Sequence, residues 1–471
     1  MTGLKRALTE FDLTNIIVGS IVGADIYIAS ALTAGLVGPF AIVVWIVAGI
    51  CATTIAVVFA YCSYYVPRAG GPFAYVSAAF DDFYGFLTGW SMWIAEMLAL
   101  PVFAIAFALY LGSVVPLSPA AEMAVRGLFI GALTTVNVVG VRVAGRLNDL
   151  LTVIKLLPLV VFILAGLVFA LLHPAFFLGN YRPFMPFGLE NAAYAVVLIF
   201  WAYVGFEMGT LPADEVKDPA RSIPRAIFRG MAIVGVFYIV TNFVLYGLIP
   251  RAALEATTTP LVLAGTILFG SAGAIFMTVG ALFSVSGSDE SGMLGSSRLA
   301  YAMAIDGLFP SVFARLHPRY GTPYVVLIVE GVVAFVLSSY ADLSGLISFS
   351  VFNLAFSFLL TSFALIVLKK DESPLLGQVF LPLAGIGICL FLLASTPPLD
   401  MVVGAVVIAA GVPIYLYFSP KTDIHHLKEE FLSEEALFLR RVAAKELYLA
   451  NFIRLLREAW DAGRQVVRRR L

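Results

Sequence analysis

Long apolar runs separated by short polar segments fill most of the chain. Most are about 18–25 residues long, the length that an α-helix needs to cross a bilayer. We predict twelve spans, at residues 13–37, 39–65, 84–112, 120–140, 148–172, 190–211, 227–249, 260–303, 323–340, 344–368, 375–395 and 400–418. The run at 260–303 is long enough to begin with a separate short helix, and Pro219 and Pro224 are predicted to close the sixth span. The pattern predicts an all-α integral membrane protein.

Two of these runs contain residues that do not suit a simple lipid-spanning helix. Gly19, Gly23 and Asp25 lie in the first span, and Gly205 and Glu207 lie in the sixth. Glycine weakens a helix by about 1 kcal/mol relative to alanine, and a carboxylate at the bilayer centre costs about 2.5–3.5 kcal/mol. Such residues are tolerated where a helix breaks and its backbone lines a cavity. Two broken helices in corresponding places therefore predict a transport site.

The composition agrees with a membrane protein and argues against several other classes. Of the 471 residues, 61% are hydrophobic, and the mean hydropathy is +0.97. The four histidines lie in loops or near the C-terminus, and no phosphate-binding glycine loop or metal-ligand spacing occurs. The sequence therefore predicts no enzyme, catalytic residue, metal or cofactor. The net charge of −1 gives no indication of a nucleic-acid partner, and the oligomeric state stays open.

Lysine and arginine are distributed unevenly between the predicted loops. Thirteen lie in loops on the side of the N-terminus, eleven in the segment after Ser419, and three on the opposite side. The positive-inside rule then predicts that both termini are cytoplasmic, in a multi-pass protein of the cell membrane. The segment 419–471 carries an apolar stripe at helical spacing and predicts a cytoplasmic amphipathic helix. It could pack on the protein, lie on membrane lipid or bind a partner.

Several motifs resemble one transporter family. They are GSIVGADIY at 19–27, PRAGGP at 67–72, FWAYVGFE at 200–207, DGLFP at 306–310 and YGTP at 320–323. In this order they are similar to the amino acid, polyamine and organocation transporter family, over roughly residues 10–418. The resemblance implies a leucine-transporter-like domain at 1–418. Its two inverted repeats of five spans would cover about 13–172 and 190–368, with helices 1 and 6 broken and two extra spans at 375–418.

The resemblance also implies a substrate site at the two breaks. In the family, exposed backbone at the breaks holds the amino and carboxylate groups of the substrate. The matching positions here are Ile21, Val22, Gly23 and Ala24 in the first span and Trp201, Ala202 and Val204 in the sixth. Half-helix termini suit this role because they present free N–H and C=O groups to charged ligands. Trp201 resembles the aromatic residue that caps the substrate; the alternative is an ordinary core aromatic.

Lys155 lies in an apolar stretch of the fifth predicted span. A buried ammonium without a partner is costly, and loss of its proton relieves that cost. In sodium-independent members of the family, a lysine at this place resembles a stand-in for sodium. The resemblance implies that its amine reaches the Gly19 carbonyl and the Ser284 hydroxyl, and that Lys155 couples transport to protons. The alternative is that Lys155 snorkels to the cytoplasmic interface.

The chain departs from the family pattern by an excess of acids. Asp25 stands where the family has a small residue, and Glu96 stands where a neutral residue is common. The eighth span adds Asp289 and Glu290, while Gly292 leaves room where the family can hold a bulky aromatic. Clustered acids attract cations or share protons, so we predict a cationic substrate with Asp25 and Glu96 as ammonium partners. Protonation of these acids, or their pairing with Lys155 or Arg298, is the alternative.

Together these observations predict a secondary transporter that works by alternating access. We expect it to be proton-coupled and sodium-independent, and to favour a polyamine or a basic amino acid. Glu207 matches an acid frequent in the family and is expected to serve gating or proton release. The alternatives are a neutral amino acid transporter, an amine or amino acid exchanger, and a membrane sensor that binds its ligand without moving it.

Overall fold

The computed structural model describes residues 8–68, 70–139, 141–210, 213, 216–369 and 376–419, without the side chains of 24, 141–154 and 376–379. The segment 420–471, with the predicted amphipathic helix, lies outside the described residues. The described part is helical, apart from an isolated bridge between Leu8 and Val216. The α-helices are α1 (Glu10–Ile21), α2 (Ala24–Val37), α3 (Ala41–Tyr65), α4 (Pro72–Ala79), α5 (Asp82–Gly112), α6 (Pro119–Val139), α7 (Val141–Leu172), α8 (Pro174–Gly179), α9 (Ala192–Trp201), α10 (Pro219–Leu248), α11 (Arg251–Ala256), α12 (Pro260–Ile305), α13 (Tyr324–Tyr340), α14 (Leu343–Leu368), α15 (Leu376–Ser395) and α16 (Pro398–Phe418).

Nine helical segments in the described part are long and apolar enough to cross a membrane. One of them, Glu10–Tyr65, contains the first two predicted spans, and two further apolar helices, Tyr324–Tyr340 and Phe380–Ser395, are shorter. The prediction of a multi-span α-helical membrane protein is therefore confirmed. The count of twelve crossings and the division into two inverted repeats of five stay predictions.

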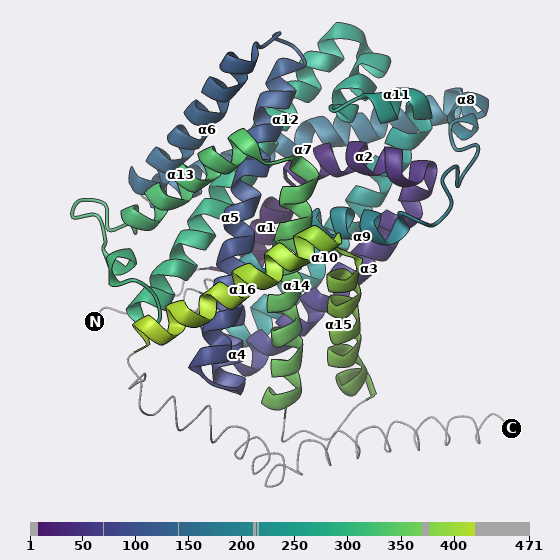
Figure 1. Ribbon diagram of the computed structural model, residues 1–471. Helices are drawn as coiled ribbons and strands as arrows, with labels where there is room; N and C mark the ends of the chain where they lie inside the picture. Colours follow the sequence, from purple (N-terminus) through teal and green to yellow (C-terminus); the bar gives the residue numbers. More distant parts are fainter. Residues whose placement is uncertain are drawn as a thin grey trace, which may run out of the picture.

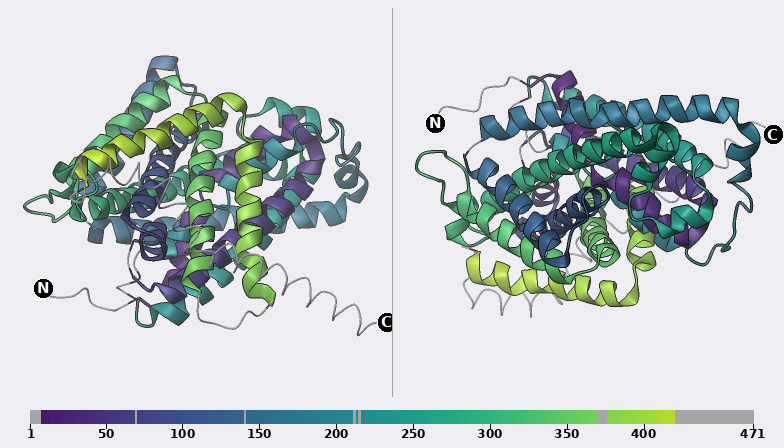
Figure 2. Two further views of the ribbon diagram at one scale, coloured as in Figure 1. Left: turned by 60° about the horizontal axis from the view of Figure 1, so that its bottom comes forward. Right: turned by 90° about the horizontal axis from the view of Figure 1, so that it is seen from above.

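Helix α5 forms the centre of the bundle. It packs against α12, α14, α13, α6 and α4. Of its most apolar 18-residue stretch, 78% is buried. Helix α16 is mostly exposed, since only 11% of its most apolar 18-residue stretch is buried. It runs along the outside of the bundle (Figures 1 and 2). The short helices α8 and α11 lie at one end of the molecule (Figure 1). Polar residues on α5 are therefore enclosed by protein on most sides.

Two helices are interrupted at the residues that the sequence singles out. Helix α1 ends at Ile21 and α2 begins at Ala24, with Val22 and Gly23 outside helical geometry. Helix α9 ends at Trp201, and a 3₁₀ helix, η2 (Phe206–Thr210), follows after a short turn. The long helix α12 is also kinked at Gly270, where φ is +64°. This kink agrees with the expected short helix at its start.

The proline-rich stretch before α10 has a different role from the one predicted. Pro219 begins α10, whereas residue 227 is the predicted start of that span, and Pro224 lies inside the helix. Proline suits the first helical turn because the N–H group that it lacks would have no intrahelical partner there. The prolines therefore start the helix that follows instead of closing the sixth span.

Gly205 allows the two interrupted helices to touch. Its φ is +119°, and a Cβ atom placed on it would lie 3.1 Å from the Ile21 nitrogen and 3.1 Å from the Ser20 carbonyl carbon. Both neighbours are backbone atoms of α1 and cannot move aside cheaply. A side chain at residue 205 would therefore strain the local backbone and separate the two interruptions.

We predict that Gly205→Ala destabilises the protein by roughly 1–3 kcal/mol, the cost of a non-glycine residue in such a conformation. The measurement is the thermal unfolding midpoint of the purified protein in detergent. Gly235→Ala is the matched control, because Gly235 lies in α10 with no atom within 4 Å of the added Cβ. Equal midpoints for the two variants would show that Gly205 does not hold the interruptions together.

Candidate functional site

The interruption of the first helix leaves backbone carbonyls without intrahelical partners, and side chains from other helices bind them. The Tyr238 hydroxyl on α10 donates to the Ile21 carbonyl at 2.8 Å. The Lys155 amine on α7 donates to the Gly19 carbonyl. The last four carbonyls of any helix need such partners, and inside a membrane water cannot supply them. The break is therefore held by α7 and α10.

The second interruption is closed by its own residues. The N–H groups of Ala202, Tyr203 and Val204 stabilise the turn after α9, and each donates to the carbonyl three residues back. The N–H of Gly205 then donates to both carboxyl oxygens of Glu207 at 3.1 Å. Glu207 is fully buried. Its carboxyl group therefore caps the backbone at the start of η2.

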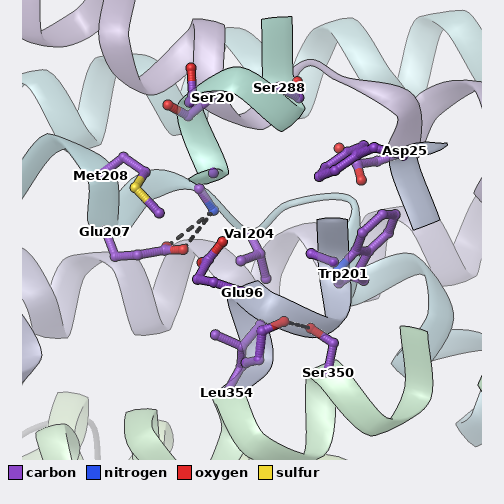
Figure 3. A pocket seen from close by; sticks show the side chains of 16 residues that line it. Ser20, Asp25, Glu96, Trp201, Val204, Glu207, Met208, Ser288, Ser350 and Leu354 are labelled. Carbon is purple, nitrogen blue, oxygen red and sulfur yellow. Dashed lines mark hydrogen bonds between the residues drawn. The ribbon is translucent and has the colours of Figure 1, made fainter. Parts of the chain in front are cut away.

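A cavity lies between the two interruptions and helices α5, α12 and α14. The side chains that line it lie close together and leave a narrow space that is partly open. Figure 3 shows side chains from these elements pointing into it. The lining residues are Ser20, Asp25, Ala95, Glu96, Ala99, Phe103, Trp201, Val204, Gly205, Glu207, Met208, Ser288, Ser291, Gly292, Ser350 and Leu354.

Six of the predicted site residues line this cavity: Asp25, Glu96, Trp201, Val204, Glu207 and Gly292. The wall also contains hydroxyl groups that the prediction omits, from Ser20, Ser288, Ser291 and Ser350. Serine is common throughout transmembrane helices, so sequence alone does not mark these four. The structure therefore brings the predicted acids and the aromatic cap to one place.

The remaining predicted residues lie around the cavity but not in its lining. Ile21, Val22, Gly23 and Ala24 form the first interruption and its flanks, and Ala202 lies in the turn after α9. Gly23 lies close to α12, because a Cβ atom placed on it would clash with the Ser288 side chain. Their expected role concerns backbone groups, so absence from the lining leaves that role as a proposal.

Three carboxyl groups face the cavity. Asp25, Glu96 and Glu207 have exposed fractions of 4%, 8% and 0%. Glu96 interacts electrostatically with both of the others, and Figure 3 shows Glu96 and Glu207 directed toward the same part of the cavity. None of the described lining residues is a lysine, arginine or histidine. The described part of the cavity wall therefore carries acids and no basic side chain.

Trp201 and Gly292 set the shape of the cavity. Trp201 packs against Phe103, with ring centroids 5.7 Å apart, so its indole forms part of the wall. A Cβ atom on Gly292 would lie 3.7 Å from Glu96 Oε2. That separation is an ordinary contact, and a larger side chain at residue 292 would meet Glu96. Glycine therefore leaves the Glu96 carboxyl group accessible from the cavity.

Lys155 lies behind the cavity and is fully buried. It therefore does not snorkel to the membrane surface. Besides its bond to Gly19, it interacts electrostatically with Asp25 and Glu290. The second expected partner, Ser284, is also buried, but its hydroxyl has no hydrogen-bond partner among the described residues. The Gly19 contact is present as predicted, and the Ser284 contact is not.

The acids of α12 lie away from the cavity lining. Asp289 and Glu290 are fully buried, and Asp289 interacts electrostatically with Glu290 and Glu330. Arg298, which the sequence offers as a pairing partner, is exposed. The two acids therefore lie in the interior on α12, while Arg298 is at the surface of the bundle.

Glu330 on α13 is a buried acid that the sequence analysis omits. It is fully buried, accepts a hydrogen bond from Trp93 Nε1 at 2.9 Å and interacts electrostatically with Glu96. Its signal in the sequence is the same as that of Asp25, an acid within an apolar span. Glu330 links the cavity acids to the interface between α5, α12 and α13.

Comparison with known proteins identifies the family of the chain. A family model described as amino acid permease matches residues 8–418. The chain belongs to the amino acid permease family. This permease is therefore a transport protein and not an enzyme, and its apolar helices place it in the membrane as a multi-pass protein.

Similar curated proteins have several different substrates in their names. The methylthioribose transporter of Bacillus subtilis (strain 168) is 28% identical over 89% of this permease and 95% of its own length. The branched-chain amino acid permease BcaP of the same organism is 28% identical over 89% and 94%. Cationic amino acid transporter 4 of Mus musculus is 28% identical over 79% of this chain and 61% of its own.

We predict that Trp93→Phe destabilises the permease by roughly 1–3 kcal/mol, because it leaves a buried oxygen of Glu330 without its donor. Thermal unfolding in detergent measures the change. In a Glu330→Leu background there is no acceptor to lose, so the same substitution should cost much less. An equal cost in both backgrounds would assign the effect to packing of the indole ring.

Proposed function

We propose that this permease is a secondary transporter for a cationic amine, either a polyamine or a basic amino acid. The substrate binds in the cavity between the two interrupted helices. The observation that carries the proposal is the charge of the cavity wall, with three acids and no basic side chain among the described lining residues. A buried carboxylate is costly unless it is paired or protonated. Lys155 interacts with Asp25 from behind the cavity, and a substrate ammonium group would pair with the acids that line it.

Asp25 gives the strongest indication of the substrate class. It lies in the first turn of α2, where the helix dipole favours a negative charge. In the family this terminus is expected to receive the carboxylate of an amino acid. Asp25 Oδ2 lies only 3.1 Å from where a Cβ of Gly23 would be, so the permease places its own carboxyl group at that terminus. A substrate carboxylate would meet repulsion there, which favours polyamines; a basic amino acid would have to offset that repulsion with its second ammonium group.

Glu96 and Trp201 are the other proposed substrate contacts. Glu96 lines the cavity from α5, and Gly292 leaves it accessible. Trp201 can bind an ammonium group over its ring, an interaction of about 0.5–2 kcal/mol. The backbone carbonyls at the end of α1, near Ile21 and Val22, are proposed to complete the ammonium site. Glu207, which caps Gly205, is proposed to act in gating or proton release.

The relatives are compatible with a cationic substrate without determining it. The name of the mouse relative specifies cationic amino acids, whereas the names of the two bacterial relatives specify branched-chain amino acids and methylthioribose. Methylthioribose carries no carboxylate, so a substrate without one has a precedent among the relatives. A neutral amino acid would be the substrate if Asp25 turned out of the cavity.

Transport is proposed to follow alternating access in a domain of twelve spans at 1–418, with two inverted repeats and both termini cytoplasmic. Lys155 is proposed to be the coupling residue. Its amine reaches the first interrupted helix through Gly19 and interacts with Asp25. Loss or gain of its proton would change both the hydrogen bond to the Gly19 carbonyl on α1 and the net charge of the site. This coupling replaces sodium, and the cell membrane is the proposed location.

We predict that Asp25→Gly changes the ligand preference of the permease from amines to neutral amino acids. Ligands that bind the folded state increase its free energy of unfolding by mass action, by about 2.7 kcal/mol at a ligand concentration of one hundred times Kd. The melting temperature rises accordingly. The measurement is a thermal-shift screen of putrescine, lysine and leucine with purified protein at low and neutral pH. Putrescine and lysine should stabilise the unmodified permease, and leucine should stabilise the variant.

Two further variants isolate the charge in that screen. Asp25→Asn keeps the size of the side chain and should also lose the response to amines. Glu190→Gln removes an exposed acid outside the cavity and should keep the original preference. If leucine stabilises the unmodified permease and the amines do not, the cationic-substrate proposal is wrong.

We predict that Lys155→Ala abolishes uptake driven by a pH gradient. The variant lacks the amine that is proposed to carry the proton and to bind the Gly19 carbonyl. Accumulation in proteoliposomes should therefore fall to the level measured without a pH gradient. Lys217→Ala removes an exposed lysine and should leave uptake unchanged. Gel filtration and thermal unfolding confirm that both variants are folded. Uptake that still follows the pH gradient in Lys155→Ala would exclude the coupling role.

A further inference from the structure

A second, larger hollow lies on the outside of the bundle, between the end of α3 and the start of α10. It spans about 1000 Å³, part of which is open to the outside of the bundle, and it shares no lining residue with the central cavity. We call it the α3–α10 groove. Its lining residues are Val57, Ala60, Tyr61, Tyr64, Tyr65, Ala220, Arg221, Pro224, Arg225 and Phe228. The transport mechanism proposed above uses none of them.

The groove joins a basic end to an apolar and aromatic wall. Arg221 and Arg225 lie in the first two turns of α10, and Phe228 follows one turn later. Tyr61 and Tyr64 line the α3 side. Phe228 is 64% exposed, and Tyr64 is 50% exposed. Exposed aromatic rings beside arginine are typical of the membrane interface. A lipid at this depth has a charged headgroup and apolar acyl chains.

The length of α10 places the arginines at that interface. The helix has 30 residues, so it is about 45 Å long at 1.5 Å per residue. The hydrocarbon core of a bilayer is about 30 Å thick. Since the apolar part of α10 begins after Arg229, the first turns extend beyond the hydrocarbon into the headgroup region. Arg221 and Arg225 therefore lie at headgroup depth, and Phe228 lies near the acyl chains.

Among the described residues, the ion pairs of this helix end neutralise its positive charge only in part. Glu10 at the start of α1 forms an ion pair with Arg229, and a longer one, at 3.7 Å, with Arg225. The Arg225 side chain stays 64% exposed. One carboxylate thus faces two arginines, and Arg221 adds a third positive charge on the same helix end. Arg225 can bind a second anion without releasing Glu10 from Arg229.

We propose that the α3–α10 groove binds an anionic phospholipid of the adjacent leaflet. The lipid phosphate is held by Arg221 and Arg225, the glycerol region contacts the tyrosine hydroxyls, and one acyl chain lies against Val57, Ala60 and Phe228. The proposal is independent of the transported substrate. Because α10 also carries Tyr238, which holds the first interrupted helix, a lipid bound here stabilises the helix pair that supports the central site.

The test compares two lipids on the full-length, delipidated permease in detergent. Phosphatidylglycerol and phosphatidylcholine with identical acyl chains are titrated, with bound lipid counted by native mass spectrometry and stability followed by thermal unfolding. Phosphatidylglycerol should bind with clear preference and raise the melting temperature. Two arginines at about 1 kcal/mol each correspond to roughly a thirtyfold change in affinity, which is the weakening expected for Arg221→Gln/Arg225→Gln.

Three further variants separate the groove from general effects of charge and folding. Arg319→Gln removes an exposed arginine that contacts Tyr320 elsewhere, and it should bind phosphatidylglycerol normally. Glu10→Gln breaks the ion pair but leaves the groove intact, so it should not weaken binding. Ala220→Trp fills the groove without removing a charge, and it should block binding. It replaces the double arginine variant in the test if that variant does not fold.

Specific outcomes would overturn the proposal. Equal binding of the two lipids would show that the groove does not recognise an anionic headgroup. Unchanged phosphatidylglycerol binding in both the double arginine variant and Ala220→Trp would place the lipid elsewhere. If Ala220→Trp alters stability but lipid has no effect on any variant, the groove is covered by protein, such as the segment 420–471 or a second copy of the chain.

Discussion

The structure depends on how backbone groups find partners where two helices stop inside the membrane. Each interruption exposes N–H and C=O groups that lipid cannot satisfy. Tyr238 and Lys155 bind the carbonyls at the end of α1, and Glu207 binds the N–H that precedes η2. Gly205 lets the two interruptions lie in contact. The same few bonds therefore fix the break, the cavity beside it and the positions of two proposed functional residues.

The acids in and around the cavity give the interior of the permease a negative charge that the family pattern does not predict. Asp25 and Glu96 line the cavity from different helices, while Asp289 and Glu330 continue the acidic set outside its lining. Lys155 is a buried cation that interacts with Asp25 and Glu290. A bound ammonium group would reduce the net negative charge of this interior. Substrate and proton would then act on one shared charge balance, which is what coupling between them requires.

The sequence predicts the interruptions well because their signals are chemical and local. Glycine and an acid are both costly in a continuous lipid-spanning helix, so the breaks at Gly23 and Gly205 and the cavity acids Asp25 and Glu96 follow from the residues. Details that depend on facing helices do not. Ser284 lacks the expected contact with Lys155, and Ser288 and Ser350 enter the wall without any mark in the sequence. Pro224 shows the limit at helix ends, where one residue type can start a helix or stop it.

The most direct measurement of the central claim is competitive uptake into proteoliposomes that contain the purified full-length permease. Radiolabelled putrescine, lysine and leucine are compared with an acidic exterior, and the membrane potential is clamped at zero so that charge alone cannot drive accumulation. The account predicts that putrescine or lysine accumulates above its external concentration and that excess leucine does not compete. Accumulation of leucine, with no uptake of the amines and no competition by them, would contradict it.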